Sequence, residues 1–138
     1  MTVRYPFEYA VLRIVPRVER GESINGGVLV YCRDLDYLGA AVHVDADRLR
    51  ALDPEIDVDR VTAALRAIAD TCGSDADGPA GAEEIGRRFR WLTAPRSTVV
   101  QPGPVHTGLT ADPDGEARRL LELLVRPVGQ PGKRDDSA

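Results

Sequence analysis

The first third of the chain alternates apolar and polar positions with the period of two that is typical of β-strands. Residues 7–15 (FEYAVLRIV) are largely apolar in both alternating sets, which predicts a central strand covered on two sides. Residues 28–32 (VLVYC) and 37–44 (YLGAAVHV) predict two further strands. Residues 19–26 are polar, and with the Asn-Gly-Gly sequence at 25–27 they predict a hairpin turn between the first two strands. Because the connections are short, we expect these strands to form an antiparallel meander.

Beyond residue 44 the pattern changes to the spacing of amphipathic helices. Asp45 is a suitable N-cap for a short helix over 46–52. A longer helix is predicted to begin at Asp53-Pro54 or at Asp57. Its apolar positions recur at intervals of three and four residues, and they are Val58, Val61, Leu65, Ile68 and Cys72. This spacing predicts one core-facing stripe along the helix.

The second half of the chain contains more helix-breaking and strand-breaking residues. Residues 73–81 (GSDADGPAG) predict a mobile loop, and 83–92 predict a helix with acidic residues in its first turn. Residues 97–101 (STVVQ) predict a short strand. Pro102 and Pro104 confine that strand to the edge of a sheet or to a bend.

The C-terminal part of the sequence predicts one more helix. Asp112 and Pro113 are a typical cap and first turn for a helix that runs through Val125. Residues 127–138 are mostly polar, and we expect them to form a disordered tail. Together the elements predict one α+β domain over 1–126, an antiparallel meander sheet of three to four strands with helices packed on it.

Composition excludes some classes of protein. The 138 residues are 43% hydrophobic and 29% charged, which is ordinary for a globular domain. No apolar run approaches the roughly 20 residues that cross a bilayer, so we expect no membrane partner. The first residues have no signal-peptide pattern, and Cys32 and Cys72 are far apart in the sequence. These features predict a reducing, cytoplasmic location without disulfide bonds.

Charge is distributed unevenly along the chain. Residues 34–84 carry thirteen acidic and four basic side chains, a net charge of −9, whereas 87–110 carry four arginines and no acid. The net charge of the whole chain is −4. Because a nucleic-acid-binding domain normally presents a dominant basic face, nucleic acid is an unlikely partner.

The acid-free stretch between Ile85 and Ala111 (the acid-free segment below) is the best candidate for a binding site. Arginines there can hold a phosphate or carboxylate in a fork of hydrogen bonds, with hydroxyl groups as further donors. The candidate ligand-binding residues are Arg13, Arg90, Arg96, Ser97, Thr98, Gln101, His106 and Thr107. The alternative is structural: the arginines pair with acids of 45–59 and tie the helices to the sheet.

Three residues have individual interpretations. Arg13 lies in an otherwise apolar strand, where a charge is costly unless it is paired or faces a pocket, and we hypothesise that it borders the same cleft as the later arginines. His106 is the candidate acid/base residue for catalysis, although a structural or ligand-contacting role is the favoured alternative. Trp91 could stack on a base, but a half-buried core position is favoured.

The sequence gives little support for a metal or a cofactor. His43, His106 and the two cysteines lack the spacings of known metal sites. The Asp-Ala-Asp at 75–77 could supply oxygen ligands, but it is equally an ordinary turn. Gly26 and Gly27 precede a strand, whereas nucleotide-binding glycines precede a helix. We therefore expect no metal and no cofactor.

Segments quoted above also carry a family resemblance. YAVLRIVPRVERGESINGGVLVYC, the acidic helical middle and RFRWLTAPRSTVVQPGPVHTGLT together resemble the bacterial family catalogued as domain of unknown function 3037. The likeness covers residues 7–125 and is most specific over 88–110. The resemblance implies no established activity. Members of the family are often encoded beside HipA-like kinase-fold proteins, which implies an accessory role with such a partner.

The expected function is therefore a cytoplasmic binding or accessory module. In this interpretation residues 90–107 hold a small anionic ligand or a protein partner. The alternative is a small enzyme that acts on a phosphorylated or carboxylated substrate, with His106 as acid/base and Arg90 and Arg96 as charge clamps. The sequence leaves open whether the protein catalyses a reaction.

Overall fold

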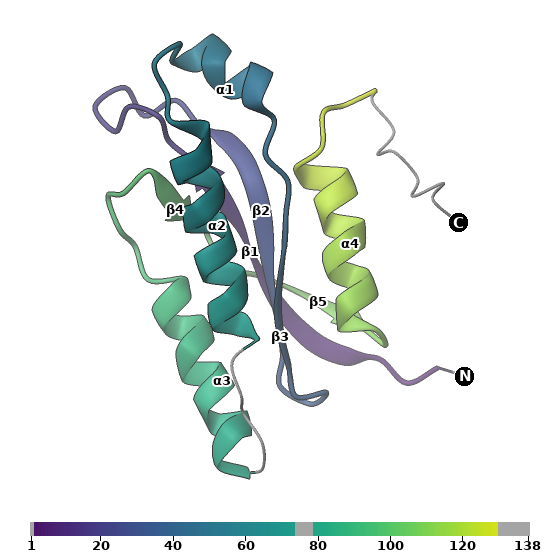
Figure 1. The fold of residues 1–138 in the computed structure, drawn as a ribbon. Coiled ribbons are helices and arrows are strands. Elements are labelled where there is room, and N and C mark those ends of the chain that lie inside the picture. Colours follow the sequence, from purple (N-terminus) through teal and green to yellow (C-terminus); the bar gives the residue numbers. More distant parts are fainter. Residues whose placement is uncertain (1, 74–78, 130–138) are drawn as a thin grey trace.

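A computed structural model describes residues 2–73 and 79–129 of the chain (Figure 1). In chain order the elements are β1 (Tyr5–Ile14), β2 (Ile24–Cys32), β3 (Tyr37–Val42), α1 (Ala46–Leu52), α2 (Val58–Cys72), α3 (Pro79–Leu92), β4 (Val100–Pro102), β5 (His106–Thr110) and α4 (Pro113–Leu124). Residues 74–78 of the predicted loop and 130–138 of the predicted tail lie outside the described residues.

The five described strands form one antiparallel sheet. Its order is β3-β2-β1-β4, and β5 also pairs with β1, on the same side as β4. The predicted α+β class and antiparallel meander are thus confirmed. The short strand predicted at 97–101 corresponds to β4, and β5 is a fifth strand that the sequence pattern did not predict.

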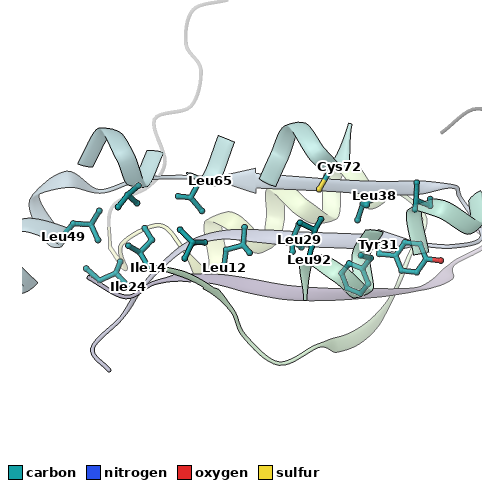
Figure 2. Close-up of a cluster of buried hydrophobic side chains, with 14 residues drawn as sticks. Leu12, Ile14, Ile24, Leu29, Tyr31, Leu38, Leu49, Leu65, Cys72 and Leu92 are labelled. Carbon is teal, nitrogen blue, oxygen red and sulfur yellow. The ribbon is translucent and has the colours of Figure 1, made fainter. Parts of the chain in front are cut away.

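Helices cover both faces of this sheet. Figure 1 shows α2 and α3 on one face, with α1 at the end of α2, and α4 on the opposite face. Each face has its own core. Leu12, Leu29 and Phe89 are buried on the α2–α3 side, whereas Phe7 and Val30 are buried against α4. Figure 2 shows the first of these clusters, in which strand side chains meet side chains of the helices.

The α2–α3 core contains an aromatic pair between sheet and helix. The rings of Tyr31 and Phe89 are stacked with centroids 5.2 Å apart, and Phe89 is completely buried. Burial of a phenylalanine side chain contributes about 1.5–3 kcal/mol by transfer from water alone. Phe89 therefore fixes α3 on the sheet, and with it the start of the acid-free segment.

Gly26 lies in a bulge of β2, so Asn25, Gly26 and Gly27 belong to the strand, and only the first residues of the turn predicted at 19–26 lie in the connection between β1 and β2. Leu12 pairs with Gly27 and Arg13 with Asn25, so Gly26 is an extra residue in the strand. A Cβ atom at Gly26 would lie 2.5 Å from Cδ1 of Ile14, which explains why glycine stands there. The turn itself falls earlier, where the N–H groups of residues 20 and 21 donate to the carbonyl of Arg17.

The helix starts follow the predicted caps. Asp45 and Asp112 accept hydrogen bonds from backbone N–H groups in the first turns of α1 and α4. Of the two starts predicted for α2, Asp57 is the N-cap, and Asp53 is the C-cap of α1. Residues 79–81, which were predicted to be loop, belong to α3.

Two side chains attach α4 to the sheet at opposite ends of the helix. Tyr37 of β3 donates a hydrogen bond to Asp114 in the first turn (3.2 Å), and the amide of Asn25 donates to the carbonyl of Leu124 in the last turn (2.9 Å). Burial and the neighbouring Asp114 raise the pKa of Tyr37 to about 12. The tyrosine hydroxyl therefore remains a donor at any ordinary pH.

Candidate functional site

The acid-free segment forms the end of α3, a connection over 93–99, and the two strands β4 and β5 along one edge of the sheet. Side chains of an edge strand alternate between the two faces of a sheet. Val100 packs in the core on the α2–α3 side, so Gln101 points to the α4 side. This alternation distributes the segment over two separate surfaces.

The eight candidate residues are accordingly not brought together in one site. Those on the α2–α3 side are Arg90, Arg96, Thr98 and Thr107, whereas Arg13, Gln101 and His106 lie on the α4 side, and Ser97 is exposed just before β4. The sheet stands between the two groups. The eight residues therefore do not form a single ligand-binding site.

Arg90 is engaged within the chain. Its two terminal nitrogens donate to the two carboxylate oxygens of Glu8 in β1, at 2.9 and 3.1 Å. The hydrogen bond to Glu8 is the main cause that raises the pKa of Arg90. This forked pair satisfies the charge of Arg90, which leaves the guanidinium less available to an external anion.

The structural alternative holds for some arginines, but with other partners than predicted. Arg88 pairs with Glu84 one helical turn away (2.8 Å) and donates to the carbonyl of Thr71 (3.2 Å). In the described part of the chain, the carboxylates that these two arginines contact are Glu84 on α3 itself and Glu8 on β1, whereas the prediction placed their partners at 45–59. Arg88 and Arg90 are thus held by the helix and by the sheet.

Arg96 is arranged differently from Arg90. Its guanidinium lies over the ring of Trp91, 4.9 Å from the ring centroid, and donates to the backbone carbonyls of Trp91 and Ala94. Trp91 is in the last turn of α3 and Ala94 lies just after it, so the guanidinium sits at the C-terminal end of the helix, where a positive charge is favourable. Among the described residues no carboxylate pairs with Arg96, so its charge is available to a ligand.

Trp91 is exposed, and its predicted position in the half-buried core is wrong. Its relative exposure is 62%, whereas the neighbouring Phe89 and Leu92 are buried. Arg96 covers part of the exposed ring from one side. An arginine stacked on an exposed tryptophan is a pair of the two residue types that most often dominate binding interfaces.

A cleft of about 780 Å³ lies next to this pair, between α2 and the segment 96–100. Its apolar lining includes Ile56, Val61, Ile68 and Val100. A volume in this range is typical of ligand-binding clefts, which are mostly apolar with a few polar groups. The cleft therefore offers room for an apolar group beside the guanidinium of Arg96.

Charges around the cleft are of two kinds. Three acids line it: Arg17 lies 3.4 Å from Asp53 and 3.7 Å from Glu55, and Asp57 accepts a hydrogen bond from the backbone N–H of Arg60 as the N-cap of α2. Arg60 and Arg96 also line the cleft, and neither has a carboxylate partner in the described part of the chain. The lining therefore carries both signs of charge, and Arg60 and Arg96 are the two guanidinium groups on it that a partner carboxylate could approach.

Arg60 is a residue that the sequence interpretation missed. The sequence does contain a weak signal, because Arg60 directly precedes Val61 in the core-facing stripe of α2 and so flanks the buried face. Thr98 lines the same cleft, but its hydroxyl donates to the carbonyl of Val100 (2.6 Å). Thr98 thus shapes the loop more than it offers a donor to a ligand.

Arg13 lies apart from the cleft. It is exposed, pairs with Gln101 across the β1–β4 ladder, and its guanidinium lies close to Gly103, where a Cβ would be 3.4 Å away. Arg13 is not among the residues that line the cleft beside Arg96. The charge of Arg13 is therefore solvated on the α4 side of the sheet and does not face the cleft.

His106 begins β5 opposite Tyr9, and its ring lies 5.2 Å from the tyrosine ring. The imidazole is exposed on the α4 side of the sheet. No described residue forms a hydrogen bond or ion pair with the His106 side chain. The described contacts thus supply neither a nucleophile nor an orienting carboxylate for an acid/base role.

Other reactive groups are buried or dispersed. Burial raises the pKa of the Cys72 thiol to about 11, which disfavours the reactive thiolate. Cys32 is buried too, and its thiol donates to the carbonyl of Pro6. Within the described ranges no three His, Cys, Asp or Glu side chains gather as metal ligands, and the acidic turn at 75–77 lies outside those ranges.

Comparison with known protein families gives a match over most of the chain. The family model described as "Protein of unknown function (DUF3037)" matches residues 9–125. No curated protein and no solved structure matches the chain. In the described residues no helix has the length and apolar character needed to cross a membrane.

Proposed function

We infer the function from the geometry of the site, because this chain belongs to the DUF3037 family, whose description assigns no activity. We propose that the protein is a binding module that docks an acidic, partly apolar segment of a partner protein. The binding surface consists of Arg96, Trp91 and the cleft beside α2. A cytoplasmic HipA-like kinase-fold protein is the partner that the family resemblance suggests.

The observation that carries this proposal is the position of Arg96. Its guanidinium is stacked on the exposed ring of Trp91 and lines the apolar cleft, and no described carboxylate neutralises it. A partner carboxylate can therefore approach the guanidinium while a neighbouring apolar side chain enters the cleft. Arg60 on the cleft rim adds a second positive charge for the same partner.

A protein segment fits this surface better than a small anion alone. Trp91 does not line the cleft and is 62% exposed, and Val99 on the lining is 41% exposed, which together is more apolar surface than a small anion would cover. Interfaces bury such residues around a central anchor and surround them with polar groups. A partner segment that covers the tryptophan and fills the cleft would bury both.

The enzyme alternative has less geometric support. Arg96 lines a cleft on the α2–α3 side of the sheet, whereas His106 is exposed on the α4 side. Arg90 is held by Glu8. A catalytic arrangement would require these groups around one substrate, so we favour binding over catalysis.

The test begins with capture of partners from an extract of the encoding organism on immobilised protein. The captured protein is then purified and its dissociation constant is measured by calorimetry. We expect Arg96→Glu and Trp91→Ala each to weaken binding at least about thirtyfold, because truncation of an interface anchor costs at least about 2 kcal/mol.

Two variants serve as matched controls. Leu123→Ala removes an equally exposed apolar side chain on α4, and Arg33→Ala removes an exposed arginine from the β2–β3 turn. Both should bind as the unmodified protein does. Equal affinity of all four variants for the purified partner would contradict the assignment of this surface.

A further inference from the structure

β5 is an uncovered edge of the sheet. It pairs with β1 on one side, and no described strand pairs with its other side. Three of its residues are exposed, namely His106, Thr107 and Leu109, and the exposure of Leu109 is 61%. The strand thus presents both backbone and apolar side-chain surface to solvent.

The direction of the unpaired backbone groups follows from the ladder. Val15 donates to the carbonyl of Val99, and Gly103 donates to the carbonyl of Val11, so odd-numbered residues of β1 bond toward this edge. Successive residues of an antiparallel strand point their backbone groups to opposite sides.

The same alternation applies to β5. Its residues 106, 108 and 110 lie opposite odd-numbered residues of β1 and direct their peptide groups inward. The N–H and C=O groups of Thr107 and Leu109 therefore point away from the sheet. An added strand could bond to both residues without any rearrangement of β1.

The edge lacks the usual protection against pairing. Natural edge strands carry charges, prolines or bulges that block another strand. The β4 half has Pro102 and Pro104, and one extra residue lies between the β4 and β5 ladders. Residues 97–111 contain no Asp, Glu, Lys or Arg, although 29% of the whole chain is charged. The β5 half is therefore neutral and open.

We propose that β5 pairs with β5 of a second copy of this chain, antiparallel and about a two-fold axis. One register pairs all five residues: Gly108 lies on the axis, and Thr107 lies opposite Leu109 of the partner subunit. In this register the four outward peptide groups of each strand are satisfied by the same groups of the other strand. The two sheets become one continuous sheet.

Two features favour a second copy over a strand of another protein. The edge is uncharged, so two identical edges meet without like-charge repulsion, and β5 offers no charge that would select a partner of opposite sign. Glycine at the axis also has no side chain to separate the strands, which approach to about 4.5 Å at a pair without hydrogen bonds. A symmetric, self-complementary contact is the commonest form of dimer.

Sedimentation velocity over micromolar to submillimolar concentrations tests this proposal. The contact is small compared with the roughly 1,200–2,000 Å² of a stable interface, so we expect dimerisation that increases with concentration. Leu109→Pro removes an outward N–H that β1 does not use, and an edge strand tolerates proline there. This variant should remain folded by circular dichroism and sediment as a monomer, whereas Leu109→Val should still dimerise.

The register is tested by disulfide formation. Thr107→Cys and Leu109→Cys are prepared separately, and the native Cys32 and Cys72 are buried. Under mild oxidation the mixture of the two variants should cross-link, and each variant alone should cross-link much less, because only unlike positions face each other. A monomer at all concentrations, or a dimer that Leu109→Pro leaves intact, would overturn the proposal. A third contradicting result is a protein that stays monomeric and loses partner binding in Leu109→Pro, because β5 would then pair with a strand of the partner protein.

Discussion

Arg90 at the end of α3 and Glu8 in the middle of β1 form a forked pair that joins helix and sheet 82 residues apart in the sequence. The pair engages the charge of Arg90 within the chain, without any ligand. It also leaves Arg96 as the arginine of the α2–α3 side on which the proposed function depends.

Arg90→Ala should lower the free energy of unfolding by less than about 1 kcal/mol, because the Arg90 side chain is largely exposed and water screens the pair. Urea unfolding of Arg90→Ala, Glu8→Gln and the double variant gives the coupling energy between the two side chains. Partner binding should change little in Arg90→Ala. A loss of binding as large as in Arg96→Glu would contradict the structural role.

Gly26→Ala should destabilise the fold by about 1–3 kcal/mol, the usual cost of forcing a methyl group into a filled core. Its Cβ would lie 2.5 Å from Cδ1 of Ile14 and 3.3 Å from Cδ1 of Leu65. Urea unfolding measures this change. Ile14→Val in the same background removes the clashing methyl and should restore part of the stability.

Gly73→Ala is the matched control for that substitution. A Cβ at Gly73 would have its nearest neighbours 3.8 Å away, and the residue has a negative φ of −88°. We expect a change within about 0.5 kcal/mol. Equal destabilisation by the two substitutions would mean that Gly26 is not held by close packing.

The stability of the protein should depend on His43 below neutral pH. Burial, with a smaller contribution from Arg126, lowers the pKa of His43 from its ordinary value of 6.5. As the pH falls below 6.5 the unfolded chain takes up this proton before the folded protein does. The stability that depends on neutral His43 is therefore fully present above pH 6.5 and is lost as the pH falls through the pKa of His43 in the folded protein.

His43→Gln should make the melting temperature less dependent on pH between about 5 and 6.5, above the range where most carboxylates titrate. The same pair of proteins compared at pH 8, where neutral imidazole dominates, reports the packing cost of the substitution separately. Parallel pH curves for the two proteins would show that His43 is not the group responsible.

Cys72 should be inert in the folded protein, since burial raises the pKa of its thiol to about 11. At pH 8 a thiol reagent such as Ellman's should react slowly with the native protein and rapidly after unfolding in urea. Cys72→Ala should leave partner binding unchanged. Rapid modification of Cys72 in native conditions would reopen the question of a catalytic thiol.

Local patterns in the sequence predicted much of this fold correctly. Aspartates 45, 57 and 112 begin helices because a carboxylate accepts from the free N–H groups of a first turn, whatever the rest of the fold does. The strands β1, β2 and β3 are likewise confirmed, because their apolar alternation reflects burial between two helical layers.

The features that sequence did not predict depend on distant partners. The glycines at 26 and 27 resemble a turn, but packing of Ile14 and Leu65 places Gly26 in a bulge. The sequence HTGLT has little strand character of its own, and it becomes β5 by pairing with residues 5–9. Tertiary contacts thus override local propensity in both places.

Of the eight candidate site residues, Arg96 and Thr98 line the cleft beside α2. The sequence pattern could not show that Arg90 meets Glu8, because that contact spans most of the chain. It also could not place His106 and Thr98 on opposite faces, since one extra residue between β4 and β5 reverses the alternation. Whether these residues bind a ligand stays a prediction.

The two attachments of α4, from Tyr37 to its first turn and from Asn25 to its last, have a mechanical consequence. These two hydrogen bonds oppose sliding of α4 along its own axis. The cleft beside Arg96 lies on the opposite face of the sheet and has no lining residue from α4. A partner docked in the cleft would therefore leave both attachments of α4 intact.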